Sequence, residues 1–119
     1  MDKVTVIGGS GFLGSHVADE LSARGFSVTI FDQMPSPWTK SDQRMVMGDV
    51  LDLSSLADAC DGARYVYHFA GIADISEAKI NPYRTIEANV LGTTAALEAA
   101  RSSQVERFVY ASTMYVYSA

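Results

Sequence analysis

The sequence predicts an α/β fold: a doubly wound parallel sheet with strand order 3-2-1-4-5. Three observations support this prediction. Short apolar runs, beginning with residues 4–7, alternate along the chain with longer segments of helical periodicity. The first run leads into a glycine-rich turn from Gly8 to Gly14. An aspartate, Asp32, ends the second run, 18 residues after Gly14. The length of 119 residues predicts a single domain, residues 1–119.

The first strand and helix have clear local signals. Residues 4–7 are Val-Thr-Val-Ile, a β-branched run with little polar alternation. Such a run is typical of a central strand that is buried on both faces of a parallel sheet. After the glycines, Leu13, Val17 and Leu21 recur at four-residue spacing and predict an apolar helix face. Gly25 follows a basic residue and predicts the end of this helix.

The second and third strands are expected at residues 27–31 and 45–47. Between them, residues 33–43 contain prolines, serines and an aspartate, which predict a loop with a short helix at most. A short helix should follow the third strand, because Asp52 or Ser54 can accept the first free N–H groups of a helix there.

The last elements continue the alternation. Residues 65–69 predict the fourth strand, and residues 108–112 predict the fifth. Between them, Asn81 is followed by Pro82, which is typical of a helix start with proline in the first helical position. The periodicity carries this helix to about Ser103. Crossovers between parallel strands are right-handed, so a ligand should bind across the carboxyl ends of the strands.

Composition and charge exclude several classes of function. The net charge of −5 argues against nucleic acid or an anionic membrane as a partner. No apolar run is long enough to cross a membrane, and no signal peptide is visible. The single cysteine, Cys60, cannot form an internal disulfide and is expected in the core, which suits a cytoplasmic protein. The two histidines, His16 and His68, stand apart from other metal-ligand residues, so we predict no metal site.

The glycine turn predicts an anion site. Gly8 allows a tight turn, Gly11 lets a pyrophosphate approach the backbone, and Gly14 lets the helix pack closely on the strand. The free N–H groups and the dipole of a helix start both favour negative charge. A glycine-rich surface loop is the alternative interpretation of this segment.

Asp32 turns this anion site into a predicted dinucleotide site. A carboxylate at the end of the second strand can accept hydrogen bonds from both hydroxyls of an adenosine ribose, and it repels a 2′-phosphate. The expected cofactor is therefore NAD rather than NADP. An aspartate that only caps a turn is the alternative. Trp38 has two interpretations, a lid over the adenine or a hydrophobic plug under its loop, and we favour the plug because aromatic side chains mostly serve packing.

Three further groups of residues follow strands three, four and five. Asp49 and Val50 could meet the edge of an adenine, although aspartates are common in loops. His68 precedes a run of small residues that leaves room for the middle of a cofactor, and we expect its ring to be structural. Ser112 and Thr113 place hydroxyls after the fifth strand, where a nicotinamide and a substrate would lie; such residues also form turns.

Six motifs stand in a fixed order along the chain. They are Gly8 to Gly14 with Ser15-His16, Asp32, Gly48-Asp49-Val50, His68-Phe69-Ala70-Gly71, Asn89-Val90-Leu91-Gly92-Thr93 and Phe108-Val109-Tyr110-Ala111-Ser112-Thr113. This set resembles the extended short-chain dehydrogenase/reductases, and within them the NAD-dependent nucleotide-sugar epimerase/dehydratase group of the UDP-glucose 4-epimerase type. The resemblance covers essentially the whole chain and implies a Rossmann-type sheet.

The resemblance implies a role for each matching residue. The implied cofactor-binding residues are Gly8, Gly11, Phe12, Leu13, Gly14, Asp32, Asp49, Val50, Phe69, Ala70, Gly71, Ile72, Asn89 and Ser112. In chain order they would contact the pyrophosphate, the ribose and the adenine and then line the path to the nicotinamide. Asn89 would support the site from the long helix. Thr113 matches the catalytic serine or threonine that hydrogen-bonds the sugar hydroxyl being oxidised.

The chain departs from the family at its catalytic base. The family uses a tyrosine whose phenol pKa is lowered by a lysine four residues later, because a phenol with its free pKa of about 10 is a poor base at neutral pH. No tyrosine here has a lysine at that offset. Tyr117 matches a different family segment, Val-Tyr-Gly, with Ser118 in place of the glycine. We therefore expect the dyad and the substrate domain beyond residue 119, with the sheet truncated after strand five and no turnover from residues 1–119.

The resemblance and the predicted sheet also indicate the partners of the protein and its alternative functions. The resemblance implies a nucleotide sugar as the substrate of the full-length protein. A bare fifth strand at the edge of the sheet predicts self-association or a homodimer, and a monodisperse monomer would refute this. A non-catalytic dinucleotide-binding sensor or scaffold is one alternative. An NAD(P)-dependent reductase of the same fold is another, although Asp32 disfavours a preference for NADP.

Overall fold

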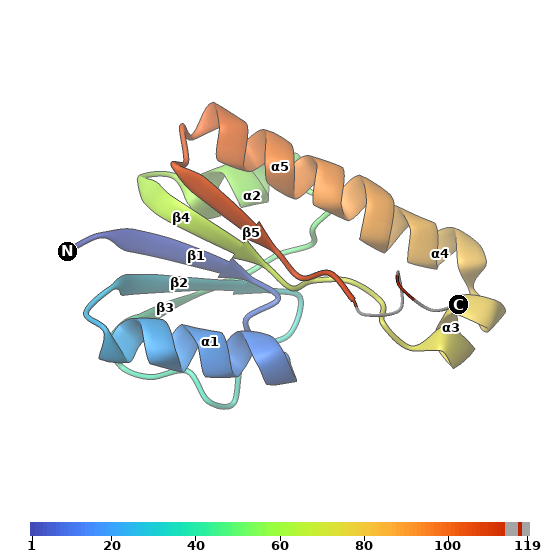
Figure 1. Ribbon diagram of the computed structural model, residues 1–119, viewed down its shortest axis with the longest axis horizontal. Coiled ribbons are helices and arrows are strands. Elements are labelled where there is room, and N and C mark those ends of the chain that lie inside the picture. Colours follow the sequence, from blue (N-terminus) through green and yellow to red (C-terminus); the bar gives the residue numbers. More distant parts are fainter. Residues whose placement is uncertain (114–116, 118–119) are drawn as a thin grey trace.

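A five-stranded parallel sheet forms the centre of the computed structural model, which describes residues 1–113 and 117 (Figure 1). The strands are β1 (Lys3–Ile7), β2 (Ser27–Asp32), β3 (Gln43–Met47), β4 (Ala63–His68) and β5 (Arg107–Tyr110). All four pairings are parallel and the spatial order is β3-β2-β1-β4-β5. The predicted fold class and strand order are therefore confirmed.

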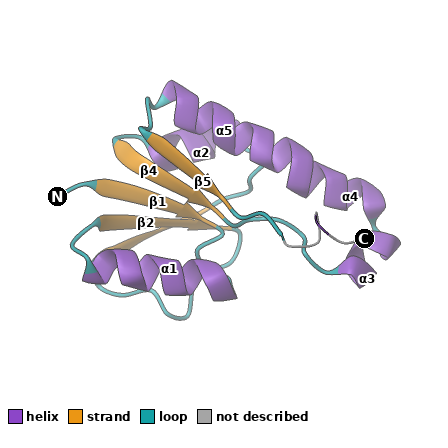
Figure 2. Ribbon diagram, in the orientation of Figure 1, coloured by secondary structure: helices purple, strands orange, loops and turns teal. Residues whose placement is uncertain are grey.

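Helices cover both faces of the sheet, as Figure 2 shows. They are α1 (Phe12–Ala23), α2 (Leu53–Cys60), α3 (Ile75–Ile80), α4 (Pro82–Ile86), the π-helical turn η1 (Glu87–Leu91) and α5 (Gly92–Ser102). Helix α1 lies on one face, and α2 and α5 lie together on the other. Helices α3 and α4 project beyond the carboxyl ends of the strands. Among the described residues, no helix is long and apolar enough to cross a membrane.

The central strand β1 is buried on both sides, as its apolar run predicts. Val4 and Val6 face α1, and Ile7 faces α2 and α5. Each such side chain contributes about 1.5–3 kcal/mol relative to exposure. The polar member of the run, Thr5, is also buried, and its hydroxyl donates a 2.6 Å hydrogen bond to the Ala59 carbonyl. This bond satisfies the hydroxyl, so the polar residue does not weaken the core.

Two of the predicted helix starts are confirmed. The Asp52 carboxylate accepts the backbone N–H of Ser55 and so caps α2. Asn81 precedes α4 with Pro82 in the first helical position, although the Asn81 side chain makes no capping hydrogen bond. Cys60 at the end of α2 is fully buried as expected, and burial raises the pKa of its thiol to about 11. The predicted long helix is present as α4, η1 and α5 in succession.

The prediction for the apolar face of α1 is wrong at its first position. Leu13 is 52% exposed, whereas Gly14, Ala18 and Leu21 are buried. The helix begins directly above the glycine turn, where a Cβ on Gly14 would overlap the Gly8 carbonyl oxygen. The contact face of α1 therefore includes Leu21 and the partly buried Val17 as predicted, but at its start the close approach of Gly14 replaces Leu13.

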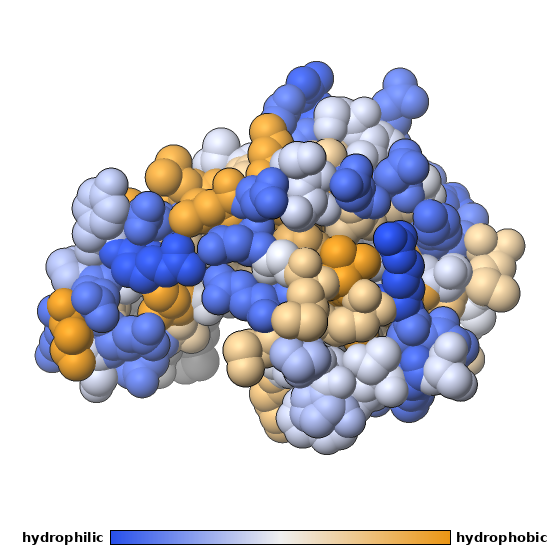
Figure 3. Space-filling view, turned by 180° about the vertical axis from the view of Figure 1, so that it is seen from behind, coloured by the Kyte–Doolittle hydropathy of each residue, from blue (hydrophilic) through white to orange (hydrophobic). Residues whose placement is uncertain are grey.

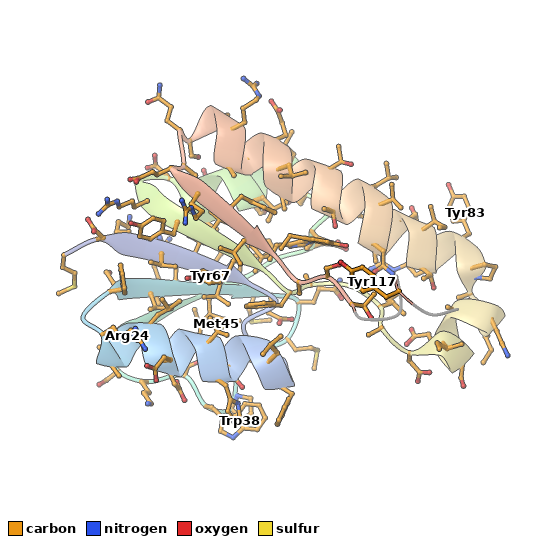
Figure 4. The ribbon with its side chains drawn as sticks, viewed as in Figure 1. Arg24, Trp38, Met45, Tyr67, Tyr83 and Tyr117 are labelled. Atoms are coloured by element: carbon orange, nitrogen blue, oxygen red, sulfur yellow. The ribbon has the colours of Figure 1, made fainter. Side chains whose placement is uncertain are left out.

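The prediction that Trp38 is a hydrophobic plug under its loop is also wrong. Its side chain is 58% exposed and points away from the sheet (Figure 4). Residues 33–42, all of which are described, contain turns and no helix, as predicted. Polar contacts hold this loop instead: the side-chain oxygen of buried Gln43 accepts the Lys40 N–H, and its amide group donates to Asp19 and Ser22.

Strand β5 lies at the edge of the sheet and is shorter than predicted. It ends at Tyr110, so Ala111 and Ser112 follow the strand rather than belong to it. Among the described residues it pairs only with β4. An edge of this kind offers unpaired backbone groups to another chain. Self-association through β5 stays a prediction.

Candidate functional site

The glycine turn joins β1 to α1 at the carboxyl end of the sheet, with Gly8 and Gly9 buried and Gly11 exposed. The Gly8 N–H donates to the Phe31 carbonyl at 2.7 Å, and Gly8 has a φ of +83°. Gly11 is the residue before α1, and it offers no side-chain cap to the helix. Because the first N–H groups of a helix lack partners inside it, this turn can hold an anion.

Asp32 is held in place from the same turn. One carboxylate oxygen accepts the Ser10 N–H at 3.0 Å, and the other accepts the Met34 N–H at 3.2 Å. The Ser10 hydroxyl donates to the Met34 carbonyl at 2.7 Å, which closes the arrangement. A carboxylate oxygen has further acceptor capacity after one hydrogen bond. Asp32 can therefore accept hydroxyl groups of a ligand without leaving its backbone partners.

A cavity of about 380 Å³ brings several predicted residues together. It is lined by Gly8, Gly11, Phe31, Asp32, Gln33, Met34, Gly48, Val50, Phe69, Ala70, Gly71, Ile72, Glu77, Arg84 and Ala88. Figure 3 shows the indentation between the lobe of α3 and α4 and the body of the sheet. The cavity lies at the carboxyl ends of the strands, where the fold predicted a ligand.

A second cavity, of about 440 Å³, adjoins the first and shares Phe69, Ala70, Gly71 and Ile72 with it. Asn89, Ser112 and Thr113 line this cavity. The residues predicted for the nicotinamide half and for substrate chemistry therefore share one space. The residues predicted for the ribose and its surroundings lie in the first cavity.

Four of the predicted site residues line neither cavity. Phe12 is 82% exposed and Leu13 is also exposed. Gly14 is buried behind the turn. Asp49 stands between Gly48 and Val50, which do line the first cavity, and its carboxylate accepts the Leu51 N–H. Direct contact of these residues with a cofactor stays a prediction.

The Asn89 side chain forms two hydrogen bonds with the backbone of Ile72, in the segment that lines both cavities. Its side-chain oxygen accepts the Ile72 N–H at 2.7 Å, and its side-chain nitrogen donates to the Ile72 carbonyl at 2.9 Å. A Cβ at Gly71 would lie 2.7 Å from the Asn89 side-chain oxygen, so this approach requires a glycine. Asn89 belongs to η1, and π-helical turns frequently mark functional sites. Asn89 thus fixes the Ile72 backbone, and its role in supporting a cofactor stays a prediction.

His68 extends this network into the core. The Thr93 hydroxyl donates to the Asn89 carbonyl at 2.6 Å, so its oxygen accepts from His68 Nε2–H at 3.1 Å. The ring is 1% exposed, and Nδ1 has no hydrogen-bond partner among the described residues. Burial lowers the pKa of His68 to about 4. The ring is therefore neutral at pH 7 and serves as a donor within the fold.

The buried, neutral ring predicts a pH-dependent stability. An unfolded His68 gains a proton below pH 6.5, whereas the folded ring resists protonation down to about pH 4. As the pH is lowered from 6.5 to about 4, the free energy of unfolding is therefore expected to decrease by up to about 3 kcal/mol. In His68→Gln, whose amide can still donate to Thr93, this part of the fall should disappear. Chemical denaturation of both proteins across the window measures it, and parallel curves would contradict the assignment.

The sequence analysis missed two charged residues that line the first cavity. Glu77 comes from α3, which was not predicted, and Arg84 comes from α4. The start of α3 has a local signal, because the Asp74 side chain accepts the Ser76 N–H. Arg84 could have been found from its spacing: it stands four residues before Ala88 on a face of small residues.

The residues present fit a phosphorylated dinucleotide. The uncapped glycine turn suits the diphosphate, and the fixed carboxylate of Asp32 in the same cavity suits ribose hydroxyls. Residues 69–72 line both cavities, and Ala70 and Gly71 add little side-chain bulk between them. The role of each individual residue in cofactor binding stays a prediction.

Comparisons with known proteins identify the family that the six sequence motifs resemble. Residues 4–119 match the model of the NAD-dependent epimerase/dehydratase family. The chain is 29% identical to a UDP-glucose 4-epimerase of Rhizobium meliloti, over 98% of this chain and 37% of that protein. It is 33% identical to the human sterol-4-alpha-carboxylate 3-dehydrogenase, decarboxylating, over 96% of this chain and 30% of that protein. The solved structure of MoeE5 in complex with UDP-glucose and NAD is 33% identical, with a TM-score of 0.88 over 98% of this chain and 38% of that one.

Proposed function

We propose, on the premise that this chain belongs to the NAD-dependent epimerase/dehydratase family, that residues 1–119 form the NAD-binding portion of a nucleotide-sugar epimerase or dehydratase. Membership confirms the resemblance read from the six motifs, and the NAD dependence of the family agrees with the predicted cofactor. The observation that carries the proposal is a single cavity that contains both the glycine turn and Asp32. The chain spans about a third of the length of the curated relatives it matches.

The proposed roles follow the two cavities. In the first, the turn from Gly8 to Gly11 binds the diphosphate, and Asp32 binds the ribose hydroxyls of the adenosine half. Residues 69–72 guide the cofactor into the second cavity, with their backbone fixed by Asn89. When bound, NAD supplies a hydride acceptor. Thr113, which lines the second cavity, orients the hydroxyl of the substrate that is oxidised.

The proton acceptor is proposed to come from outside residues 1–119. No tyrosine of this chain has a lysine four residues later, so these residues lack the dyad that would make a phenol a base at neutral pH. The curated UDP-glucose 4-epimerase relative, of which this chain covers 37%, supports the nucleotide sugar as the substrate class. The MoeE5 complex with UDP-glucose and NAD supports it further.

Residues 1–119 are expected to bind NAD without turning over a substrate. Titration calorimetry should give a saturable NAD signal, with weaker binding of NADP because Asp32 repels a 2′-phosphate. Incubation with NAD and UDP-glucose should produce neither NADH nor UDP-galactose. Absence of NAD binding by the folded chain would contradict the cofactor-binding role, and measurable turnover would contradict the assignment of the base to other residues.

A hydroxysteroid-type dehydrogenase is the second candidate. The human sterol-4-alpha-carboxylate 3-dehydrogenase is 33% identical to this chain, the same identity as a UDP-glucose 4-epimerase of Erwinia amylovora. Both functions use the same cofactor half, so NAD binding does not separate them. Assays of a longer protein that contains this chain, with UDP-glucose and with a 3β-hydroxysteroid, would decide between them.

A further inference from the structure

One charged residue interrupts the inner face of the long helix. Gly92 and Ala96 of α5 and Ala88 of η1 are buried, each four residues from the next. The next position in this row is Arg84 on α4. A Cβ on Gly92 would lie 2.7 Å from the Val50 side chain, which shows how closely this face approaches the body of the protein. Arg84 continues the same face at the point where it meets the first cavity rather than the core.

The charges around the first cavity make Arg84 distinctive. Asp32 and Glu77 line the cavity, and the Asp49 carboxylate stands beside it. Among the described lining residues, Arg84 is the only cation. Three carboxylates around a cavity that would take a diphosphate oppose binding, because like charges repel in a partly desolvated site. A cation at the same place offsets them.

The contacts of Arg84 leave its guanidinium able to bind a ligand. Its nearest charged partner among the described residues is Asp49, with an Nη2–Oδ2 distance of 3.9 Å. This distance is too long for a hydrogen bond. The side chain is 38% exposed, so it is neither fixed in the core nor directed wholly into solvent. A guanidinium has five N–H donors and can contact an anion and Asp49 together.

We propose that Arg84 is a cofactor-binding residue that contacts the ADP-ribose part of NAD through its positive charge. This inference rests on the proposed function. It places a contact from α4 opposite the contacts from the glycine turn and Asp32, so that the adenosine half is bound from both sides of the cavity.

The test measures affinity in matched arginine variants. Arg84→Ala and Arg84→Gln remove the charge, and Arg84→Lys keeps it. Arg101→Ala is the control, because Arg101 is an exposed helix residue that pairs with Glu98 outside both cavities. Titration calorimetry with NAD and with ADP-ribose follows each variant at low and high salt. Thermal unfolding confirms that each variant is folded.

The neutral variants are expected to bind NAD and ADP-ribose about tenfold more weakly at low salt, which is the scale of one charge-assisted contact. The difference from the unmodified chain should shrink at high salt, because salt screens partly exposed charges. Arg84→Lys should retain most of the affinity, and Arg101→Ala should retain all of it. Neutral variants within twofold of the unmodified chain for both ligands would overturn the inference while leaving the proposed function intact. If the unmodified chain binds neither ligand, the proposed function fails and the inference fails with it.

Discussion

Asp32→Ala is expected to weaken NAD binding by about 10- to 100-fold, because two hydrogen bonds from ribose hydroxyls to a charged acceptor are lost. The same change should bring the affinities for NAD and NADP closer together, since the alanine no longer repels a 2′-phosphate. The carboxylate also accepts the Ser10 and Met34 N–H groups, so part of the loss reflects a looser loop.

Two control variants separate these contributions. Ser10→Ala removes the hydroxyl contact with the Met34 carbonyl and leaves the Asp32 carboxylate in place, so it should lower affinity less and leave the cofactor preference unchanged. Asp42→Ala removes an exposed carboxylate from the same connection between β2 and β3 and should leave binding unaltered. Titration calorimetry with both cofactors measures all four proteins. An unchanged ratio of NAD to NADP affinity in Asp32→Ala would refute the ribose role.

Gly8→Ala is expected to destabilise the fold severely, by about 3 kcal/mol or more. Gly8 has a φ of +83°, and a Cβ there would lie 2.8 Å from the backbone carbon of Phe69. It would also lie 2.9 Å from the Cα of Ala70, and these are backbone atoms that cannot move aside as a side chain could. The alanine must therefore adopt a left-handed conformation and also push apart the segments that follow β1 and β4 at the cavity.

Gly25→Ala is the matched control for this prediction. Gly25 has a φ of +90°, but a Cβ there would meet nothing within 4 Å. Only the conformational cost remains, about 1–2 kcal/mol. Urea denaturation of the unmodified chain, Gly8→Ala and Gly25→Ala measures the loss of stability that each substitution causes. Equal losses would mean that the close approach of Gly8 to Phe69 and Ala70 contributes nothing to stability.

Much of the fold could be predicted because its signals are local. The apolar run of β1, the glycines after it and the proline at Pro82 each restrict the backbone at their own positions. The alternation of strands and helices then leaves few topologies, because crossovers are right-handed. The observed order β3-β2-β1-β4-β5 follows from that restriction.

The errors concern side chains whose surroundings come from distant segments. Leu13 and Trp38 are as apolar as core residues, yet both are exposed, since no other part of the described chain covers them. Strand β5 ends at Tyr110 because pairing with β4 ends at His68. Helix α3 was missed because it has six residues, none of them buried, and so no apolar periodicity.

By itself, the sequence determined the order of the strands, the glycine turn, the position of Asp32 and the family, because each depends on backbone limits or on motifs within short segments. The tertiary structure alone decided that the two ends of the site form separate cavities divided by residues 69–72. It also decided that Arg84 from α4 lines the same cavity as Asp32 and lies near Asp49. Such placements depend on how α4, η1 and α5 pack against the sheet. The spacing of residues along the chain does not give the distance between segments that come together only in the folded protein.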